Sequence, residues 1–329
     1  MAFSWKDQPR PIVALSPMAD MTDSPFCRVA KRFGAKIVFR EMVSAEAIVR
    51  GSAKTLQMAA FHPEERPIVQ QIFGKDPSVM AEATRIVYET HQPGAIDVNM
   101  GCPVYKITSD FNGAALMKEP ERAEEIIRQM VASVPVPVSV KIRLGWSNPD
   151  EAKDFAPQLE QAGAALLTVH GRTRAQGYSG VSDWARIGEV KQRVSIPLLA
   201  NGDIHQPEAA VEALRVSGAD GVLVARGALG NPWRMAQMEE MLRFGEVRTV
   251  IDEATRRRTI LEHFDLMAEE NALRLGSGQG EAQAAILMRK HLSWYYKGAH
   301  GAKELRSRLV RITSRADLLA ALNGMVIAV

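Results

Sequence analysis

The segment AIDVNMGCP, residues 95–103, begins as an apolar run and then turns through glycine, cysteine and proline. The run does not alternate cleanly with polar residues, which is typical of a strand buried on both faces of a parallel sheet. Similar runs recur at roughly even intervals: IVALSP (12–17), KIVFREM (36–42), PIVQQIFG (67–74), PVSVKIRLG (137–145), ALLTVHGR (165–172), IPLLANGD (196–203) and GVLVARGA (221–228). Together they predict eight buried parallel strands.

Amphipathic helical patterns separate these predicted strands. In residues 120–134 apolar side chains recur at three- and four-residue spacing, which places them on one face of a helix. Residues 76–91 and 206–218 show the same pattern, and Gly218 is the expected stop of the latter. Alternating units of this kind predict an α/β fold, a (β/α)₈ TIM barrel. The alternative, a doubly wound open sheet, lacks its GxGxxG fingerprint after the first strand.

The predicted strands stop near residue 245, and the remaining sequence is helical in pattern. The expected helical segments are residues 252–275, 281–298, 302–312 and 314–324, with GSGQG (276–280) as a break between the first two. We therefore predict two domains, a barrel over residues 1–245 and an all-helical domain over residues 246–329.

Composition excludes several classes of protein. Of the 329 residues 46% are hydrophobic, and no run approaches the 18 apolar residues of a membrane helix. The N-terminal segment carries charges and no apolar signal sequence, so we expect a cytoplasmic protein. We also expect a monomer. Two cysteines far apart in sequence predict neither disulfides nor a metal site. The net charge of +3 says little until its distribution is considered.

Polar side chains follow almost every predicted strand, at the end where barrels of this class carry their chemistry. They are SPMAD (16–20), Arg40 and Glu41, Gln70 and Gln71, Asn99 and Cys102, Lys141 and Arg143, His170 and Arg172, Asn201 and Asp203, and Arg226 with Gly227. Any strand becomes polar where it meets solvent. A lysine and a glutamine inside otherwise apolar runs nevertheless favour a functional rim.

The last two strand ends indicate a phosphate-binding site. ANGDI and ARGALGNPW place Gly202 and Gly227 where the backbone can approach a ligand closely, with Arg226 beside them. Lys141 would be a buried cation unless it faced an anion, and a reduced flavin is anionic near N1. A phosphate and an electron-accepting ring together predict FMN as the cofactor.

The two cysteines differ in their surroundings. Cys27 lies within a helical pattern and is expected to be a small buried hydrophobe. Cys102 lies between Gly101 and Pro103 in a rim loop, where a thiol can act as a nucleophile or a general acid. No histidine is adjacent in sequence to form a thiolate, so a proton donor is the simpler role.

Several motifs occur here in the order found in one enzyme family. They are SPMADMTDSPFC, VQQIFG, DVNMGCPVYK with NGAALM, VKIRLGW, TVHGRTR, NGDI, ARGALGNPW and the C-terminal RKHLSWYYKG. From Pro11 to Ile312 the chain resembles the bacterial tRNA-dihydrouridine synthases, most closely their B-type branch. One difference is Ala225, where the family usually has glycine.

The resemblance implies an activity and a set of site residues. Enzymes of this family bind FMN, reduce it with NADPH (or NADH), pass hydride to C6 of a uracil in tRNA and protonate C5 from a cysteine, here Cys102. The residues expected to contact FMN are Pro17, Met18, Ala19, Gln71, Lys141, His170, Asn201, Gly202, Asp203, Ala225 and Arg226. Those expected to contact the tRNA substrate are Asn99, Arg143, Lys106, Arg172, Arg289 and Lys290. Neither a metal nor a membrane is expected as a partner.

Positive charge is concentrated near the C-terminus. Residues 281–315 hold Arg289, Lys290, Lys297, Lys303, Arg306, Arg308, Arg311 and Arg315 against Glu281 and Glu304. The basic residues predict phosphate contacts with RNA. For the interleaved aromatics Trp294, Tyr295 and Tyr296 we favour packing against the barrel over base stacking.

Two other functions remain open from the residues. A flavin barrel could act on a small pyrimidine such as dihydroorotate, but that function would need no basic helical domain. An RNA-binding protein without catalysis would need neither Cys102, Lys141 nor the phosphate loops.

Overall fold

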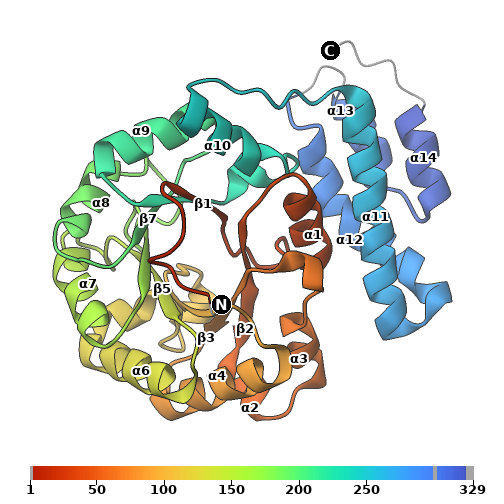
Figure 1. The fold of residues 1–329 in the computed structure, drawn as a ribbon. Coiled ribbons are helices and arrows are strands. Elements are labelled where there is room, and N and C mark those ends of the chain that lie inside the picture. The colour runs from red at the N-terminus through yellow and green to blue at the C-terminus, as the bar shows by residue number, and fades with distance from the viewer. Residues whose placement is uncertain (1–2, 299–301, 324–329) are drawn as a thin grey trace.

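Eight parallel strands close into a barrel in which each strand pairs with the next and β1 pairs with β8. The computed structural model describes residues 3–298 and 302–323. The strands are β1 (Ile12–Leu15), β2 (Ile37–Ser44), β3 (Ile68–Phe73), β4 (Ala95–Met100), β5 (Val138–Arg143), β6 (Leu166–His170), β7 (Leu198–Asn201) and β8 (Gly221–Val224). All eight predicted strands are present, and the predicted (β/α)₈ barrel is confirmed (Figure 1).

Helices form a ring around the barrel. They are α1 (Ser24–Arg32), α2 (Ala45–Val49), α3 (Ala53–Ala59), α4 (Pro77–His91), α5 (Tyr105–Thr108), α6 (Pro120–Ser133), α7 (Glu151–Gln161), α8 (Trp184–Lys191), α9 (Pro207–Ser217) and α10 (Arg234–Phe244), with short 3₁₀ turns η1 (Pro63–Glu65), η2 (Gly113–Lys118) and η3 (Arg226–Ala228). Local sequence sets their ends. Asp76 caps α4 by accepting hydrogen bonds from two backbone N–H groups, and Gly218 ends α9 in the left-handed conformation, as predicted.

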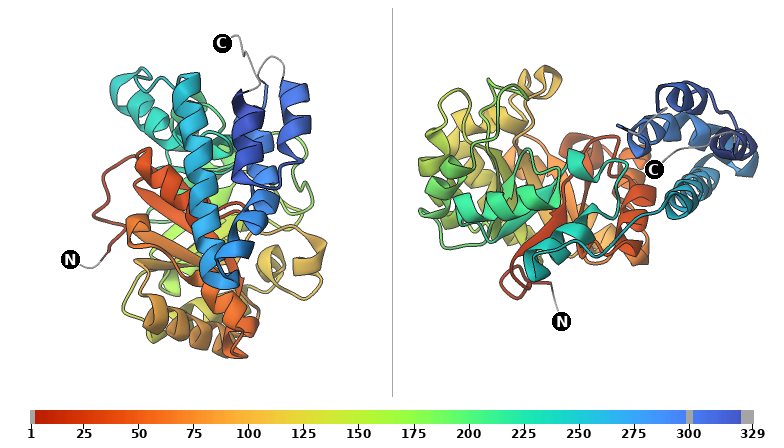
Figure 2. Two further views of the ribbon diagram at one scale, coloured as in Figure 1. Left: turned by 90° about the vertical axis from the view of Figure 1, so that its right-hand side faces the viewer. Right: turned by 90° about the horizontal axis from the view of Figure 1, so that it is seen from above.

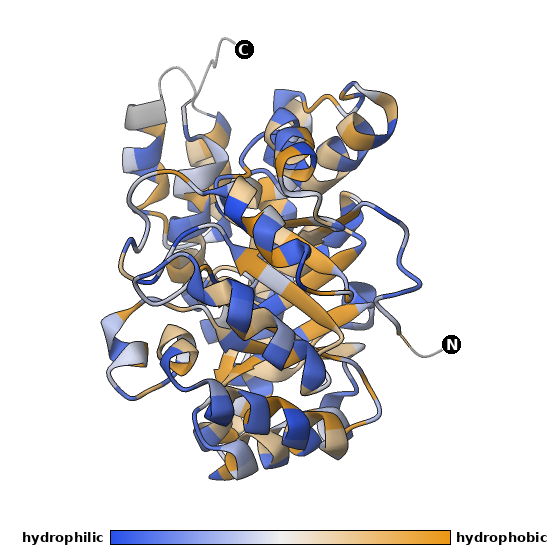
Figure 3. Ribbon diagram, turned by 90° about the vertical axis from the view of Figure 1, so that its left-hand side faces the viewer, coloured by the Kyte–Doolittle hydropathy of each residue, from blue (hydrophilic) through white to orange (hydrophobic). Residues whose placement is uncertain are grey.

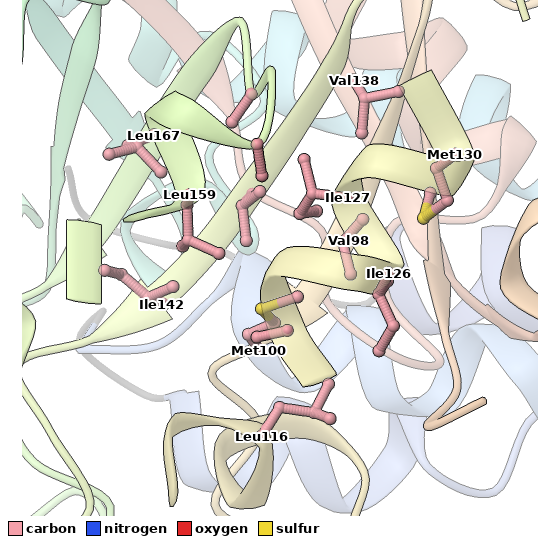
Figure 4. Packing of buried hydrophobic residues seen from close by; sticks show 14 of the residues in the cluster. Val98, Met100, Leu116, Ile126, Ile127, Met130, Val138, Ile142, Leu159 and Leu167 are labelled. Carbon is pink, nitrogen blue, oxygen red and sulfur yellow. The ribbon is translucent and has the colours of Figure 1, made fainter. Parts of the chain in front are cut away.

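The largest core lies between the strands and the surrounding helices. Figure 4 shows Ile126, Ile127 and Met130 of α6 packed among side chains of the strands and of α7. Figure 3 shows the strands coloured mainly as hydrophobic, while the outer helices also carry hydrophilic residues. This two-sided burial is the reason why the strands appear as continuous apolar runs in the sequence.

The inside of the barrel is apolar at one end and polar at the other. Toward the amino ends of the strands, the interior is filled by Trp5 and by apolar side chains at alternate strand positions. These are Ile12, Ala14, Ile37, Phe39, Val69, Ala95, Leu166, Leu199 and Leu223. The next inward positions, toward the carboxyl ends, are polar. In the strand register Asn99 pairs with Lys141, and His170 pairs with both Arg143 and Asn201. These polar side chains therefore meet at the carboxyl end of the barrel, next to the apolar cluster.

Four further helices pack beside the barrel: α11 (Glu253–Leu275), α12 (Ser277–Tyr295), α13 (Ala302–Leu309) and α14 (Arg315–Asn323). They share an apolar core of their own and lie next to α1 (Figures 1 and 2). The predicted break at 276–280 is shorter than expected, because only Gly276 (φ 88°) interrupts the helices and α12 begins at Ser277. Among the described residues, no helix is both long enough and apolar enough to cross a membrane.

Candidate active site

A cavity of about 790 Å³ lies at the carboxyl ends of the strands. Its volume is within the range of cofactor and small-molecule sites, roughly 300–1,000 Å³. Most of the predicted site residues line it: Pro17, Met18, Ala19, Gln71, Asn99, Cys102, Lys106, Lys141, Arg143, His170, Asn201, Gly202, Asp203, Ala225 and Arg226. The strand ends therefore converge on one site, as the sequence predicted.

Three predicted tRNA contacts do not line this cavity. Arg172 is 2% exposed and binds the carboxylate of Asp203 through both terminal nitrogens, at 3.0 and 2.6 Å. On α12, Arg289 donates to the carbonyl oxygen of Ile312, and the Lys290 ammonium contacts the carbonyl oxygen of Asp20. Arg172 thus positions a cavity residue, whereas Lys290 lies near the cavity edge.

Arg40 and Gln70 are also absent from the cavity. Side chains alternate along a strand, so these residues face outward from the barrel while Gln71 faces inward. Arg40 is buried in an ion pair with Glu65 at 3.1 Å, and the Gln70 amide donates to the carbonyl oxygen of Glu41. Both residues are structural in this position.

The loop that carries Cys102 is held by hydrogen bonds from two strands. Asn99 Oδ1 accepts from the backbone N–H groups of Gly101 and Cys102, at 3.2 and 2.9 Å. Arg143 Nε donates to the carbonyl oxygen of Gly101 at 2.8 Å. Arg143 is 2% exposed and also donates to the carbonyls of Thr173 and Gly177. Asn99 and Arg143, which were predicted as tRNA contacts, therefore position the loop that carries the thiol.

The NGAALM segment supports the same loop from the other side. Gly113 adopts a φ of +59°, and a Cβ there would lie 3.0 Å from the carbonyl oxygen of Cys102. That carbonyl accepts a hydrogen bond from the N–H of Ala114 at 3.1 Å. Cys102 remains partly exposed and lines the cavity, whereas Cys27 is fully buried in α1. The predicted difference in burial between the two cysteines is confirmed.

A buried polar chain lies below the cavity. Ser139 Oγ donates to Asp97 at 2.6 Å, Gln71 Nε2 donates to Asp97 at 2.6 Å, and Asn99 Nδ2 donates to Gln71 Oε1 at 2.9 Å. Burial raises the pKa of Asp97 to about 6, against the opposing effects of Ser139, Gln71 and the charge of Lys141. Asp97 could not be selected from the sequence, because it lies in the middle of β4 rather than at the rim.

The cavity wall is rich in cations. Burial, helped by the charge of Arg143, lowers the pKa of Lys141 to about 8. Burial also lowers the pKa of Arg143 to about 10. Burial and then the charge of Lys141 hold the pKa of His170 well below its usual value, so the imidazole is neutral at pH 7. His170 Nδ1 is buried and makes no hydrogen bond within residues 3–298 and 302–323, so the cavity offers both positive charge and an unused polar atom.

Glycine and arginine shape the far side of the cavity. Gly202 has a φ of +110°, and a Cβ there would lie 2.4 Å from Ser182 Oγ. Burial alone would raise the pKa of Asp203, but its hydrogen bonds from Arg172 and the N–H of Ser182 lower it. The Arg226 side chain is 41% exposed and lies 3.4 Å from Asp203. Arg226 therefore keeps donors available to an anion.

Tyr178 is a cavity residue that the sequence did not predict. Its ring is 60% exposed at the mouth, 5.6 Å from the Arg143 guanidinium carbon and 5.3 Å from that of Arg226. In the sequence Tyr178 is marked only as an aromatic residue between two glycines, in GYSG (177–180). Met42 and His205 also line the cavity without a motif to mark them.

The C-terminal basic region is less free than its composition suggests. Tyr295 and Tyr296 are each 2% exposed, but they pack in the core of the C-terminal helices, so the predicted packing against the barrel is wrong for both. Of the three aromatics, only Trp294 packs against the barrel core. The half-buried ring of Trp294 lies 4.4 Å from the ammonium of Lys297. Arg315 forms an ion pair with Asp265 at 2.6 Å, so it is not a free phosphate ligand.

Comparisons with known proteins identify the family. Residues 13–328 match the family model described as dihydrouridine synthase. The chain belongs to the dihydrouridine synthase family. It is similar to "Probable tRNA-dihydrouridine synthase 1" of Synechocystis (42% identity, 92% of this chain, 82% of the relative). It is also similar to "Probable tRNA-dihydrouridine synthase" of Rhodobacter capsulatus (40%, 95% and 94%) and "tRNA-dihydrouridine synthase B" of Pseudomonas syringae pv. tomato (39%, 91% and 86%).

The family resemblance seen in the sequence is thus confirmed, and the family is one of enzymes. Among solved structures, a 2-naphthoyl-CoA reductase complex matches with a TM-score of 0.54 at 12% identity, over 70% of this chain and 50% of that chain. Histamine dehydrogenase from Rhizobium sp. 4-9 matches with a TM-score of 0.55 at 10% identity, over 78% and 49%. The chain spans about half the length of each, and at this identity the likeness concerns the fold alone.

Proposed function

We propose that this protein reduces specific uridines in tRNA to 5,6-dihydrouridine, with FMN as cofactor and NADPH (or NADH) as reductant. The observation that carries the proposal is the partly exposed Cys102 thiol at a cation-lined cavity of cofactor size. The names of the relatives support uridine in tRNA as the substrate.

The residues of the cavity fit a flavin mononucleotide. Arg226 and the close backbone turn at Gly202 suit a phosphate, because one offers exposed donors and the other excludes a side chain. Lys141 suits the ring region where a reduced flavin is anionic, and its depressed pKa reflects a cation without enough nearby negative charge. The unpartnered Nδ1 of His170 is a further polar atom for the cofactor to satisfy.

The protein's own part in the reaction is to hold a proton and to position it. Hydride for C6 of the uracil ring is the chemistry that FMN would supply when held by these residues. Addition at C6 leaves enolate character conjugated to the C4 carbonyl, which requires a proton at C5. Cys102 Sγ holds that proton as a general acid, while Asn99 and Arg143 fix the loop that presents it.

The substrate must enter the cavity as a base turned out of its stack. We propose residues 1–245 as the catalytic domain and residues 246–329 as a tRNA-binding domain. Lys106 at the cavity, Arg289 and Lys290 on α12 are the proposed backbone contacts, and the exposed ring of Tyr178 suits base stacking. The protein would act in the cytoplasm as a monomer, and the uridine reaction itself needs no metal.

The test is product formation with two classes of substrate. Purified protein, NADPH and FMN are incubated with unmodified tRNA, or with free uracil, uridine and dihydroorotate, and products are measured by mass spectrometry. The proposal predicts that nucleosides from tRNA gain two hydrogens while the small pyrimidines do not react. Turnover of a free pyrimidine without reduction of tRNA would overturn it in favour of the small-molecule enzyme.

A further inference from the structure

A second cluster of chemically active side chains lies where the barrel meets the C-terminal helices. Asp23 precedes α1, His263 lies on α11 and His291 lies on α12. One potential ligand atom from each lies within 4.8 Å of the others. His263 and His291 are 0% and 1% exposed. Figures 1 and 2 show α11 and α12 side by side, next to α1.

The histidines have nitrogen atoms without partners. His263 Nε2 and both ring nitrogens of His291 are buried and make no hydrogen bond with the described residues. His291 Nε2 lies 3.8 Å from Asp23 Oδ2, which is too long for a hydrogen bond. Buried polar atoms are nearly always satisfied, so three such nitrogens beside one carboxylate call for a ligand.

Asp23 can serve this ligand without giving up its structural role. Its Oδ1 caps α1 by accepting from the N–H of Phe26 at 3.0 Å, which leaves Oδ2 toward the histidines. Imidazole nitrogen and carboxylate oxygen are both common ligands of transition-metal ions.

The second ring nitrogen of His263 is oriented as in metal sites. His263 Nδ1 lies 3.1 Å from the hydroxyl oxygen of Tyr295, which is itself buried. A hydrogen bond to the outer nitrogen of a ligating histidine fixes the ring and directs the other nitrogen to the metal. Zinc–ligand bonds of about 2.0 Å place tetrahedral ligand atoms about 3.3 Å apart, so a small inward movement of the three side chains would suffice.

We propose that Asp23, His263 and His291 bind one divalent first-row transition-metal ion, with Zn²⁺ as the foremost candidate. Two imidazoles and one carboxylate suit this class of ion, and a water molecule can take the fourth position. The sequence predicted no metal, because these ligands come from distant segments and show no ligand spacing. The ion would tie α11 and α12 to the barrel at the start of α1.

Such a tie bears on the proposed function. Asp20, three residues before Asp23, lines the catalytic cavity, and its carbonyl oxygen contacts Lys290 of α12. Metal binding therefore fixes the helical domain relative to the cavity. The proposed metal site does not depend on the proposed tRNA activity. Only its consequence for the helical domain and the cavity rests on that activity.

The experiment measures zinc binding in the absence of tRNA. Chelator-treated protein is titrated with ZnCl₂. The amount of bound metal is measured by elemental mass spectrometry, and the melting temperature is recorded with and without zinc. One equivalent of zinc with a higher melting temperature is expected for the wild type. His263→Asn and His291→Asn should each lose that zinc and the shift, whereas His62→Asn, an exposed control at the N-cap of η1, should keep both.

Two further variants distinguish loss of zinc through misfolding, and zinc binding at another residue, from the proposed site. Tyr295→Phe keeps the buried ring and should weaken zinc binding about 10- to 100-fold, as loss of an outer hydrogen bond does elsewhere. Cys102→Ala should retain the zinc, because the other plausible zinc ligand, the cavity thiol, is not part of the site. Absence of stoichiometric zinc in the wild type, or loss of zinc only in Cys102→Ala, would overturn the proposal while leaving the uridine reaction untouched.

Discussion

The charge of Lys141 is costly in the flavin-free protein, and a methionine there would remove the cost. Burial, with the charge of Arg143, lowers its pKa from 10.5 to about 8. Since a tenfold change in proton affinity equals about 1.36 kcal/mol, keeping the ammonium charged at pH 7 costs the fold about 3 kcal/mol. Lys141→Met also removes a favourable charge near Asp97. We expect a net rise of about 1–3 kcal/mol in the free energy of unfolding.

The pH dependence gives the sign of this effect. Below about pH 8 Lys141 is charged in both the folded and the unfolded chain, so the cost is fully present. Between that value and 10.5 the unfolded chain binds the proton more tightly, so the cost fades as the pH rises. The stability advantage of Lys141→Met should therefore be largest at pH 7 and shrink toward pH 10. Lys54→Met, on the exposed face of α3, should change stability by no more than about 0.5 kcal/mol at either pH.

Flavin binding should change in the opposite direction. A hydrogen bond to a charged group contributes about 1.5–3 kcal/mol, so Lys141→Met should bind FMN about 10- to 150-fold more weakly. Urea unfolding of flavin-free protein gives the stability, and quenching of flavin fluorescence gives the affinity. A variant that is no more stable than the wild type, yet binds FMN equally well, would refute the assignment of Lys141 as a cation held for an anion.

Three more substitutions test other parts of the site and the fold. Asn99→Ala should lower kcat on tRNA about 10²-fold and change KM much less, because the lost bonds orient Cys102; steady-state kinetics separate the two. Gly202→Ala should yield protein with little flavin, because its Cβ would meet Ser182; the absorbance of purified protein measures this. Glu65→Gln should cost about 3–5 kcal/mol in urea unfolding, because it leaves a buried guanidinium unpaired.

Each of these has a matched control or a contrary outcome. A rise in KM alone for Asn99→Ala would mean that the residue binds tRNA rather than orienting the thiol. Gly218→Ala also has a positive φ but meets open space, so it should keep its flavin. Glu64→Gln, next to the buried carboxylate but 30% exposed, should cost no more than about 1 kcal/mol.

The barrel and most of the cavity could be predicted because they follow from local patterns. Strands buried on both faces show as apolar runs, and their carboxyl ends must meet at one rim whatever the loop lengths. Gln71, Lys141 and His170 were therefore predictable as neighbours. The family resemblance then assigned their roles.

The remaining features depend on contacts between distant segments. Inward or outward direction of a rim residue depends on strand register, so Arg40 and Gln70 were indistinguishable in sequence from Gln71. The pairing of Arg172 with Asp203 and the cluster of Asp23 with the histidines of α11 and α12 are set by packing. The number of basic residues near the C-terminus likewise exceeds the number of cations available to RNA. Ion pairs such as that of Arg315 with Asp265 form only in the folded protein.

The most direct test of the account is a single turnover by the proposed acid. Enzyme with its flavin reduced beforehand is mixed with unmodified tRNA, and dihydrouridine is measured by mass spectrometry over time for wild type, Cys102→Ala and Cys27→Ala. We predict rapid product with wild type and Cys27→Ala, and a loss of at least about 10²-fold with Cys102→Ala, the scale of general acid catalysis. Product formation at the wild-type rate by Cys102→Ala, with its flavin retained, would contradict the central role given to this thiol.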